Sequence, residues 1–170
     1  LAVGDSSHCI KLFDISKYSE IRTISSHSDR VSSLAWNNYV LSSGSRDSTI
    51  VQHDMRVNSY FVKLLSHKQE VCGLRWNENF TYLASGGNDN KICVWELGNQ
   101  VPTHELKEHK AAVKALAWCP WKTQVLASGG GSSDKNIKLW DVGEGKCLES
   151  VDTGSQVSAL EWNKCGKELL

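Results

Sequence analysis

The chain has 170 residues, of which 40% are hydrophobic and 22% are charged. This composition is typical of a folded globular protein, and it excludes an intrinsically disordered chain or an integral membrane protein. The 19 basic residues balance the 19 acidic ones, so the formal net charge is zero. No general electrostatic attraction to nucleic acid or to anionic lipid is therefore expected, and we predict neither nucleic acid nor a membrane as a partner.

Six cysteines are spread along the chain, and no two of them have C-x-x-C spacing. Most stand in apolar strand contexts, as Cys72 and Cys93 do. A free cysteine in such a context behaves as a small buried hydrophobe, so we expect free thiols and a reducing, intracellular compartment. A disulfide framework or a zinc site is the alternative.

A pattern of valine, leucine and tryptophan, V-x-x-L-x-W, occurs four times. The copies begin at steps of 40, 42 and 44 residues, at Val31, Val71, Val113 and Val157. The position four residues before each valine holds His27, His67, His109 and Thr153. A period of this length built from short strands predicts an all-β fold, a β-propeller of the WD-repeat kind.

Each period has the same predicted order of elements. The V-x-x-L-x-W strand is followed by a second strand that ends in Ser-Gly, predicted at 40–44, 82–86 and 125–129. A polar turn containing aspartate leads into a third strand, at 50–54, 92–96 and 137–141. The outer strands are less regular and are predicted at 60–65, 103–106 and 147–151.

The ends of the chain fall in the same part of the repeat, because residues 1–4 align with 41–44 and residues 169–170 with 40–41. We therefore expect a piece of a longer protein, with three complete blades (25–65, 66–106 and 107–151) and two partial ones (1–24 and 152–170) of a seven-bladed ring. A four-period ring closed by the two half-blades is the alternative.

Each blade carries a histidine, a serine, an aspartate and, in two blades, a tryptophan at matched positions. The sets are His27, Ser43 and Asp47; His67, Ser85, Asp89 and Trp95; and His109, Ser128, Asp134 and Trp140. In the first set His53 takes the tryptophan position. Each set resembles a hydrolase triad, but three copies at one period favour buried structural hydrogen-bond networks, since catalysis needs one site. We expect no enzyme, no cofactor and no metal.

Two turns depart from the repeat. Residues 85–90 place Asn88 and Asn90 around the turn aspartate, and residues 128–134 lengthen the matching turn with small residues. The asparagine amides suit recognition of an extended polar or acidic peptide; alternatively, they only supply positive-φ turn geometry. Lys107, Lys110 and Lys114 alternate with acidic residues, which predicts an ordinary solvated surface.

Several runs are more specific than a general WD pattern. They are 41–46 (LSSGSR), 53–56 (HDMR), 70–76 (EVCGLRW), 84–90 (ASGGNDN), 112–121 (AVKALAWCPW), 126–131 (LASGGG) and 154–157 (GSQV). These runs closely resemble the Fizzy and Fizzy-related family, the substrate-recruiting activators of the anaphase-promoting complex. The resemblance extends over the whole chain. It implies a seven-bladed propeller that recognises degrons on cell-cycle substrates and presents them to this ubiquitin ligase.

The resemblance also implies a KEN-box site on the top face. Asn88, Asn90 and Gln156 match peptide-binding positions of the family, and Ser132 stands where the family commonly has threonine. The family's destruction-box groove lies between its first and last blades, so no residue here is assigned to it. A further groove for a hydrophobic–acidic motif, between the second and third blades, is also left unassigned.

Implied partners are the anaphase-promoting complex, degron-bearing substrates such as cyclins and securin, and spindle-checkpoint proteins, in the nucleus and cytoplasm. The subfamily stays open: 45–47 and 153–156 look Fizzy-related, whereas 53–54 and 118–121 look Fizzy-like. A general WD-repeat interaction scaffold without degron specificity is the alternative function.

Overall fold

The computed structural model describes residues 1–57, 61–163, 165 and 167–170, and every regular element in these ranges is a β-strand. The first sheet contains β1 (Ala2–Gly4), β2 (Cys9–Asp14) and β3 (Ser19–Ser25). The second contains β4 (Val31–Asn37), β5 (Val40–Ser45), β6 (Thr49–Asp54) and β7 (Phe61–Leu65). The third contains β8 (Val71–Trp76), β9 (Tyr82–Gly87), β10 (Ile92–Glu96) and β11 (His104–Leu106).

The fourth sheet contains β12 (Val113–Trp118), β13 (Val125–Gly130), β14 (Asn136–Asp141) and β15 (Lys146–Asp152). A hairpin of β16 (Trp162–Asn163) and β17 (Glu168–Leu169) follows. Each of these sheets is antiparallel and joins its strands in sequence order. The predicted all-β blade architecture, with three four-stranded blades and two partial ones, is confirmed. The predicted outer strand at 60–65 is β7 from Phe61 onward, and Tyr60 lies outside the described residues.

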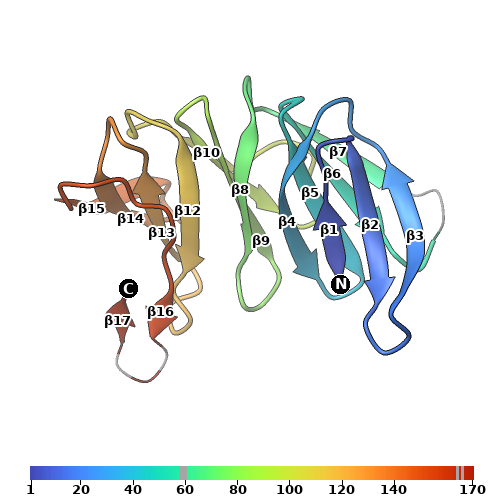
Figure 1. Ribbon diagram of the computed structural model, residues 1–170. Coiled ribbons are helices and arrows are strands. Elements are labelled where there is room, and N and C mark those ends of the chain that lie inside the picture. The colour runs from blue at the N-terminus through green and yellow to red at the C-terminus, as the bar shows by residue number, and fades with distance from the viewer. Residues whose placement is uncertain (58–60, 164, 166) are drawn as a thin grey trace.

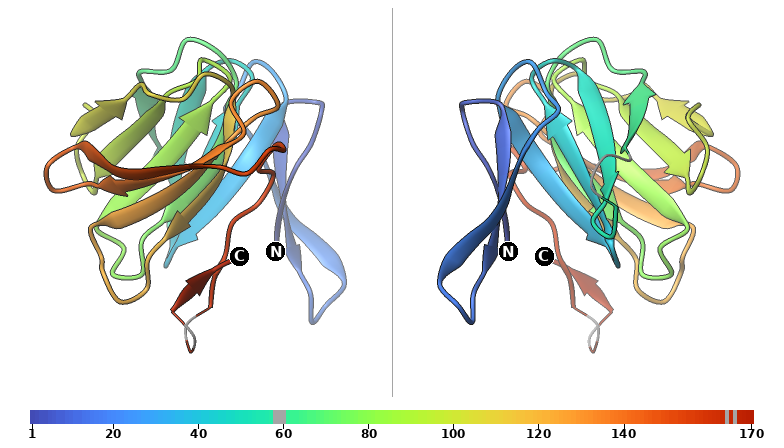
Figure 2. Two further views of the ribbon diagram at one scale, coloured as in Figure 1. Left: turned by 90° about the vertical axis from the view of Figure 1, so that its left-hand side faces the viewer. Right: turned by 90° about the vertical axis from the view of Figure 1, so that its right-hand side faces the viewer.

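The sheets stand side by side in an arc, each presenting its first strand to the same side (Figure 1). Strand β4 contacts β1 and β8, and β8 contacts β12. The β4–β5, β8–β9, β12–β13 and β16–β17 hairpins project to one end of the arc, the lower end of Figure 1. In the three four-stranded sheets, the turns between the second and third strands therefore lie at the opposite end, which we call the top edge. The first sheet and the final hairpin lie at the two sides of the arc in Figure 1, and the side views of Figure 2 show the final hairpin projecting below the four-stranded sheets.

A repeated glycine–valine contact sets the spacing between neighbouring blades. A Cβ on Gly4 would lie 2.7 Å from Cγ1 of Val31, and a Cβ on Gly44 would lie 2.7 Å from Cγ1 of Val71. A Cβ on Gly129 would likewise meet Cγ1 of Val157, whereas a Cβ on Gly86 would first meet the carbonyl oxygen of Val113. Only a residue without a side chain permits this approach, so the glycine of the second strand and the valine of the pattern fix each blade against the next.

Three of the four tryptophans of the pattern also join neighbouring blades, through their indole N–H groups. Trp76 donates to Oγ of Ser42 at 3.2 Å, and Trp118 donates to the carbonyl of Arg75 at 2.9 Å. Trp162 donates to the carbonyl of Ala117 at 3.1 Å. Each such hydrogen bond crosses from one sheet to the preceding one, so both ends of the V-x-x-L-x-W pattern contact the neighbouring blade.

The fourth copy of the pattern differs from the prediction, because residues 157–161 form no strand and only Trp162 is in one. The reason is pairing: β17 reaches only Trp162 and Asn163. The cysteines are less uniformly buried than expected. Cys93 and Cys119 are buried, whereas Cys165 is exposed, and all six are free thiols. No helix in the described residues has the length and apolarity needed to span a bilayer.

Candidate peptide-binding face

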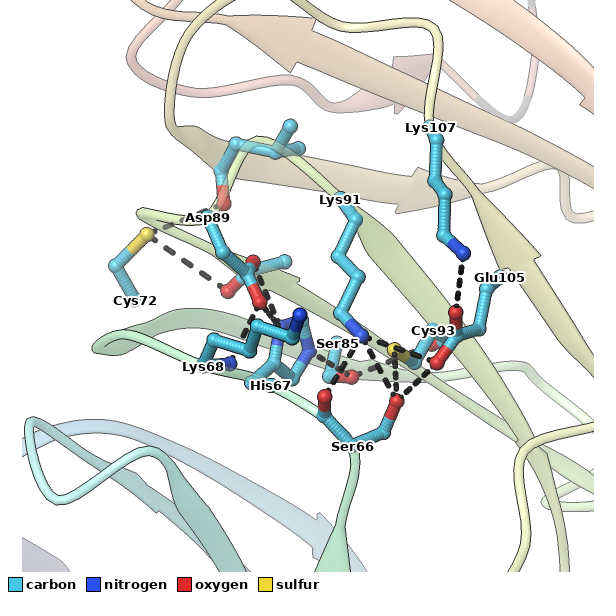
Figure 3. A network of polar contacts seen from close by, with 12 residues as sticks. Ser66, His67, Lys68, Cys72, Ser85, Asp89, Lys91, Cys93, Glu105 and Lys107 are labelled. Carbon is cyan, nitrogen blue, oxygen red and sulfur yellow. Dashed lines mark hydrogen bonds and ion pairs between the residues drawn. The ribbon is translucent and has the colours of Figure 1, made fainter.

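The blade of β8–β11 contains a chain of four hydrogen-bonded side chains, and Figure 3 shows three of them, those of His67, Ser85 and Asp89. Nδ1 of His67 lies 3.0 Å from Oδ1 of Asp89, and its Nε2 lies 2.9 Å from Oγ of Ser85. Nε1–H of Trp95 donates to the same hydroxyl at 2.9 Å. Asp89 also accepts the backbone N–H of Lys68 at 2.8 Å. The chain thus ties the loop before β8 to the turn between β9 and β10.

The next blade repeats this arrangement. His109 contacts Asp134 through Nδ1, and its Nε2 lies 2.7 Å from Oγ of Ser128. Trp140 donates to that hydroxyl at 2.7 Å. Ser85 and Ser128 have no exposed surface, so neither hydroxyl can reach a substrate carbonyl. The triad-like geometry is therefore used for structure, since a nucleophile must be able to contact its substrate.

The blade of β4–β7 departs from this pattern at its last member. His27 lies 3.0 Å from Oδ2 of Asp47 and 2.8 Å from Oγ of Ser43. His53, which occupies the tryptophan position, instead places Nε2 2.9 Å from Oγ of Ser26. Its imidazole is shorter than an indole and turns to the loop before β4. In this blade the hydroxyl of Thr49 joins the network, because it donates to Oδ1 of Asp47 at 2.7 Å, whereas His53 forms a separate contact.

Burial and hydrogen bonding act in opposite directions on the network aspartates. Burial raises the pKa of Asp47, but hydrogen bonds from Thr49 and Ser28 outweigh it and hold that pKa below its ordinary value. The pKa of Asp134 is lowered in the same way by His109, against the effect of burial. Burial lowers the pKa of His27 and of His109 despite the neighbouring carboxylates. Buried aspartates that stay ionised keep the turns of the top edge fixed.

The turn between β9 and β10 carries both asparagines. Asn88 is exposed, and its backbone N–H donates to the carbonyl of Glu70 at 2.8 Å. Asn90 has a φ of +65°, and the matching positions Ser48 and Lys135 have φ values of +68° and +60°. A serine and a lysine thus adopt the same left-handed conformation in the other two turns. Turn geometry alone consequently does not require asparagine at Asn90, and Asn88 has no positive φ.

Asn88 lies in a depression of about 480 Å³ between two blades, lined by Arg30, Arg46, Gln69, Glu70 and Asn88. Arg30 forms a two-pronged ion pair with Glu70, with Nε–Oε1 and Nη2–Oε2 distances of 2.9 and 2.7 Å. The side-chain nitrogen Nδ2 of Asn88 lies 3.5 Å from Oε2 of Glu70. Sequence reasoning missed this pair, whose members are one period apart in the chain. Arg46 occupies the position in its blade that Asn88 occupies in the next blade. The backbone N–H of Arg46 donates to the carbonyl of Arg30, just as that of Asn88 donates to the carbonyl of Glu70.

Ser132 and Gln156 lie at the same edge. Ser132 is exposed in the turn between β13 and β14, which closes with hydrogen bonds from Asp134 and Lys135 to the carbonyl of Gly131. Gln156 is exposed in the segment after β15, and Nε2 of its side chain lies 3.5 Å from Oγ of Ser158. The next residue, Val157, donates its N–H to the carbonyl of Gly130, so this segment is attached to the end of β13.

The four predicted peptide-binding residues thus occupy the top edge of two adjacent blades and of the segment that follows them. Their side chains are exposed or half-buried, whereas the network residues beneath them are buried. This division gives a rigid base with polar groups directed outward. The outward-facing groups are side-chain amides and a hydroxyl, which both donate and accept hydrogen bonds.

Comparison with known proteins gives a consistent result. The family described as the CDC20/Fizzy WD40 domain matches residues 1–170. The "Anaphase-promoting complex subunit cdc20" of Dictyostelium discoideum is 47% identical over 100% of this chain and 35% of its own length. The "APC/C activator protein CDH1" of Saccharomyces cerevisiae is 47% identical over 100% of this chain and 30% of its own.

Among solved structures, a chain of the "Crystal Structure of Mitotic Checkpoint Complex" superimposes with a TM-score of 0.97 at 42% identity. This match covers 99% of the present chain and 52% of that chain. The present chain spans about a third of the length of the curated relatives.

Proposed function

Because the chain belongs to the CDC20/Fizzy WD40 family, we propose that it is part of a non-enzymatic adaptor that activates the anaphase-promoting complex and recognises degron peptides on cell-cycle substrates. Its partners in this proposal are the ligase, substrates such as cyclins and securin, and spindle-checkpoint proteins. The protein would act in the nucleus and the cytoplasm.

The observation that supports peptide recognition most strongly is the pair of asparagines on the turn between β9 and β10. Their side chains are accessible to a ligand, and the backbone of this turn does not require them. An asparagine amide both donates and accepts hydrogen bonds, so it pairs with peptide amides and with the side chains of glutamate or asparagine. A KEN-type peptide contains both of these residue types.

The buried network beneath the turn makes this recognition efficient. Asp89 stands between the two asparagines and is fixed by His67 and by the backbone N–H of Lys68. The asparagines therefore need little ordering when a peptide binds, and a pre-organised site loses less conformational entropy. Ser132 and Gln156 would contact the peptide from the adjacent blade and the following segment.

The test is the affinity of a fluorescent KEN peptide for the full-length protein. The variant combines Asn88→Ala with Asn90→Gly, because glycine accepts the φ of +65° at position 90 without strain. Each asparagine that leaves a peptide group unpaired costs about 1–3 kcal/mol, so affinity should fall at least tenfold.

The matched control combines Asn79→Ala and Asn99→Ala, two exposed asparagines in turns at the opposite end of the same blade. This control should bind like the wild type. Equal affinity of the wild type and the Asn88/Asn90 variant would overturn the site. A full-length protein that ignores both KEN and destruction-box peptides would instead indicate a general WD-repeat scaffold.

A further inference from the structure

A second depression, of about 910 Å³, begins at Asn90 and extends outward along the rim. We call it the rim groove. Two blades contribute to it: Leu65 ends the outer strand β7, whereas Val101 and Pro102 precede the outer strand β11. Because Asn90 lines this groove, a peptide held by the asparagines can continue into it.

The floor of the rim groove carries more positive than negative charge. Lys91 and Lys107 share one carboxylate, that of Glu105, at 3.0 and 2.7 Å (Figure 3). Hydrogen bonds from Lys107, Ser66 and Lys91 lower the pKa of Glu105 to about 2, so this group is ionised at neutral pH. One anion thus faces two ammonium groups, and one positive charge is left over.

Lys68 adds a further cation. Its side chain is exposed and lines the groove, and it forms no ion pair within the part of the chain that the structure describes. The other acidic residue of the lining, Asp89, is already engaged by His67 and by the N–H of Lys68. The outer wall is apolar, with Leu65 65% exposed and Val101 75% exposed. Apolar surface beside a charge reduces its contact with water, which strengthens its attraction to an opposite charge.

We propose that the rim groove binds acidic residues flanking the degron core held by Asn88 and Asn90. The occupant is a carboxylate-bearing stretch of the same peptide, contacted by Lys68 and Lys107. This inference rests on the proposed function and adds a specificity element to it. The buried Lys91 acts as a positioning residue, because it holds Glu105 on the floor and leaves Lys107 directed at the groove.

The test compares three fluorescent peptides that share one Lys-Glu-Asn core. The first has neutral flanks, the second has glutamates on its N-terminal side, and the third has the same glutamates on its C-terminal side. Binding to the full-length protein is measured at low and at high salt. One of the two acidic peptides should bind about 3- to 20-fold tighter than the neutral peptide, and the difference should shrink at high salt, as partly exposed ion pairs do.

The variant Lys68→Ser/Lys107→Ser should remove most of this difference. Its control is Lys17→Ser/Lys122→Ser, two exposed lysines in turns remote from the groove, which should retain the difference. Both variants are checked for wild-type circular dichroism and melting temperature. Because Lys68 and Lys107 are exposed, their replacement should not prevent folding.

Three results overturn the inference. Equal binding of all three peptides means that the acidic flank does not contribute to affinity, although the degron core still binds and the proposed function stands. A preference that survives Lys68→Ser/Lys107→Ser but disappears in Arg46→Ala places the flank in the depression beside Asn88. Failure of the core peptide itself to bind rejects the proposed function, and the inference with it.

Discussion

The two buried serines Ser43 and Ser85 provide a matched pair for measuring the hydrogen-bond network. Each occupies the same position in its blade and has no exposed surface. Each hydroxyl contacts a histidine Nε2, at 2.8 and 2.9 Å. They differ in one partner, because Trp95 donates to Ser85, whereas His53 does not contact Ser43.

Replacing each serine by alanine removes one oxygen atom and changes the packing little. Ser85→Ala leaves two buried groups without a partner, Nε2 of His67 and Nε1–H of Trp95, whereas Ser43→Ala leaves only Nε2 of His27. An unsatisfied buried polar group costs about 1–3 kcal/mol. Ser85→Ala should therefore lower the free energy of unfolding by about 2–6 kcal/mol and Ser43→Ala by about 1–3 kcal/mol.

The assay is urea-induced unfolding of the full-length protein followed by circular dichroism, with linear extrapolation to zero urea. Trp95→Phe supplies the internal control, because it removes the extra donor. In that background Ser85→Ala should cost about as much as Ser43→Ala does in the wild type. Equal losses for the two single variants would refute the reasoning. So would a cost of Ser85→Ala that Trp95→Phe does not change.

Two further predictions concern blade spacing and pH. Gly44→Ala should destabilise the protein by about 1–3 kcal/mol through overpacking, because the new methyl group would lie 2.7 Å from Val71 Cγ1. Adding Val71→Ala should make the combined loss smaller than the sum of the single losses, and simple additivity in urea unfolding would contradict the contact. The pKa of His53 is lowered to about 4 by burial, helped by His27 and Arg22. The unfolded chain then binds a proton near pH 6.5 that the folded chain takes up only near pH 4, so stability should fall as the pH is lowered through this window. His53→Trp should show a smaller drop in melting temperature between pH 7 and 4.5, and an unchanged drop would exclude His53 as a source.

The fold could be predicted from the sequence because each blade packs against the next through the same contacts, which require the same residues at each repeat. The glycine and the valine recur at fixed positions, as at Gly44 and Val71, because both are needed where blades meet. The hydrogen-bond partners of His53 could not be predicted, since alignment with tryptophan says nothing about which neighbour a shorter ring can reach. The fourth strand at 157–161 was predicted from its pattern but lacks a pairing partner.

The candidate site was predictable only in part. The asparagines of the turn between β9 and β10 stand out by residue type, and family resemblance assigned them a ligand. The interpretation of Lys107 as part of an ordinary solvated surface was incomplete. Its carboxylate partner Glu105 also binds Lys91, which is 14 positions away and only 8% exposed. Local charge patterning cannot show that a lysine so distant in sequence is buried against the same carboxylate, so the rim groove appears only in the structure.

Hydrogen–deuterium exchange of the full-length protein with and without a KEN peptide tests the central claim most directly. The account predicts slower exchange in three segments of the top edge: 87–91, 131–135 and 154–157. The hairpins at the opposite end, between β8 and β9 and between β12 and β13, should not change. Protection of those hairpins, or no protection in the turn that carries Asn88 and Asn90, would contradict the account.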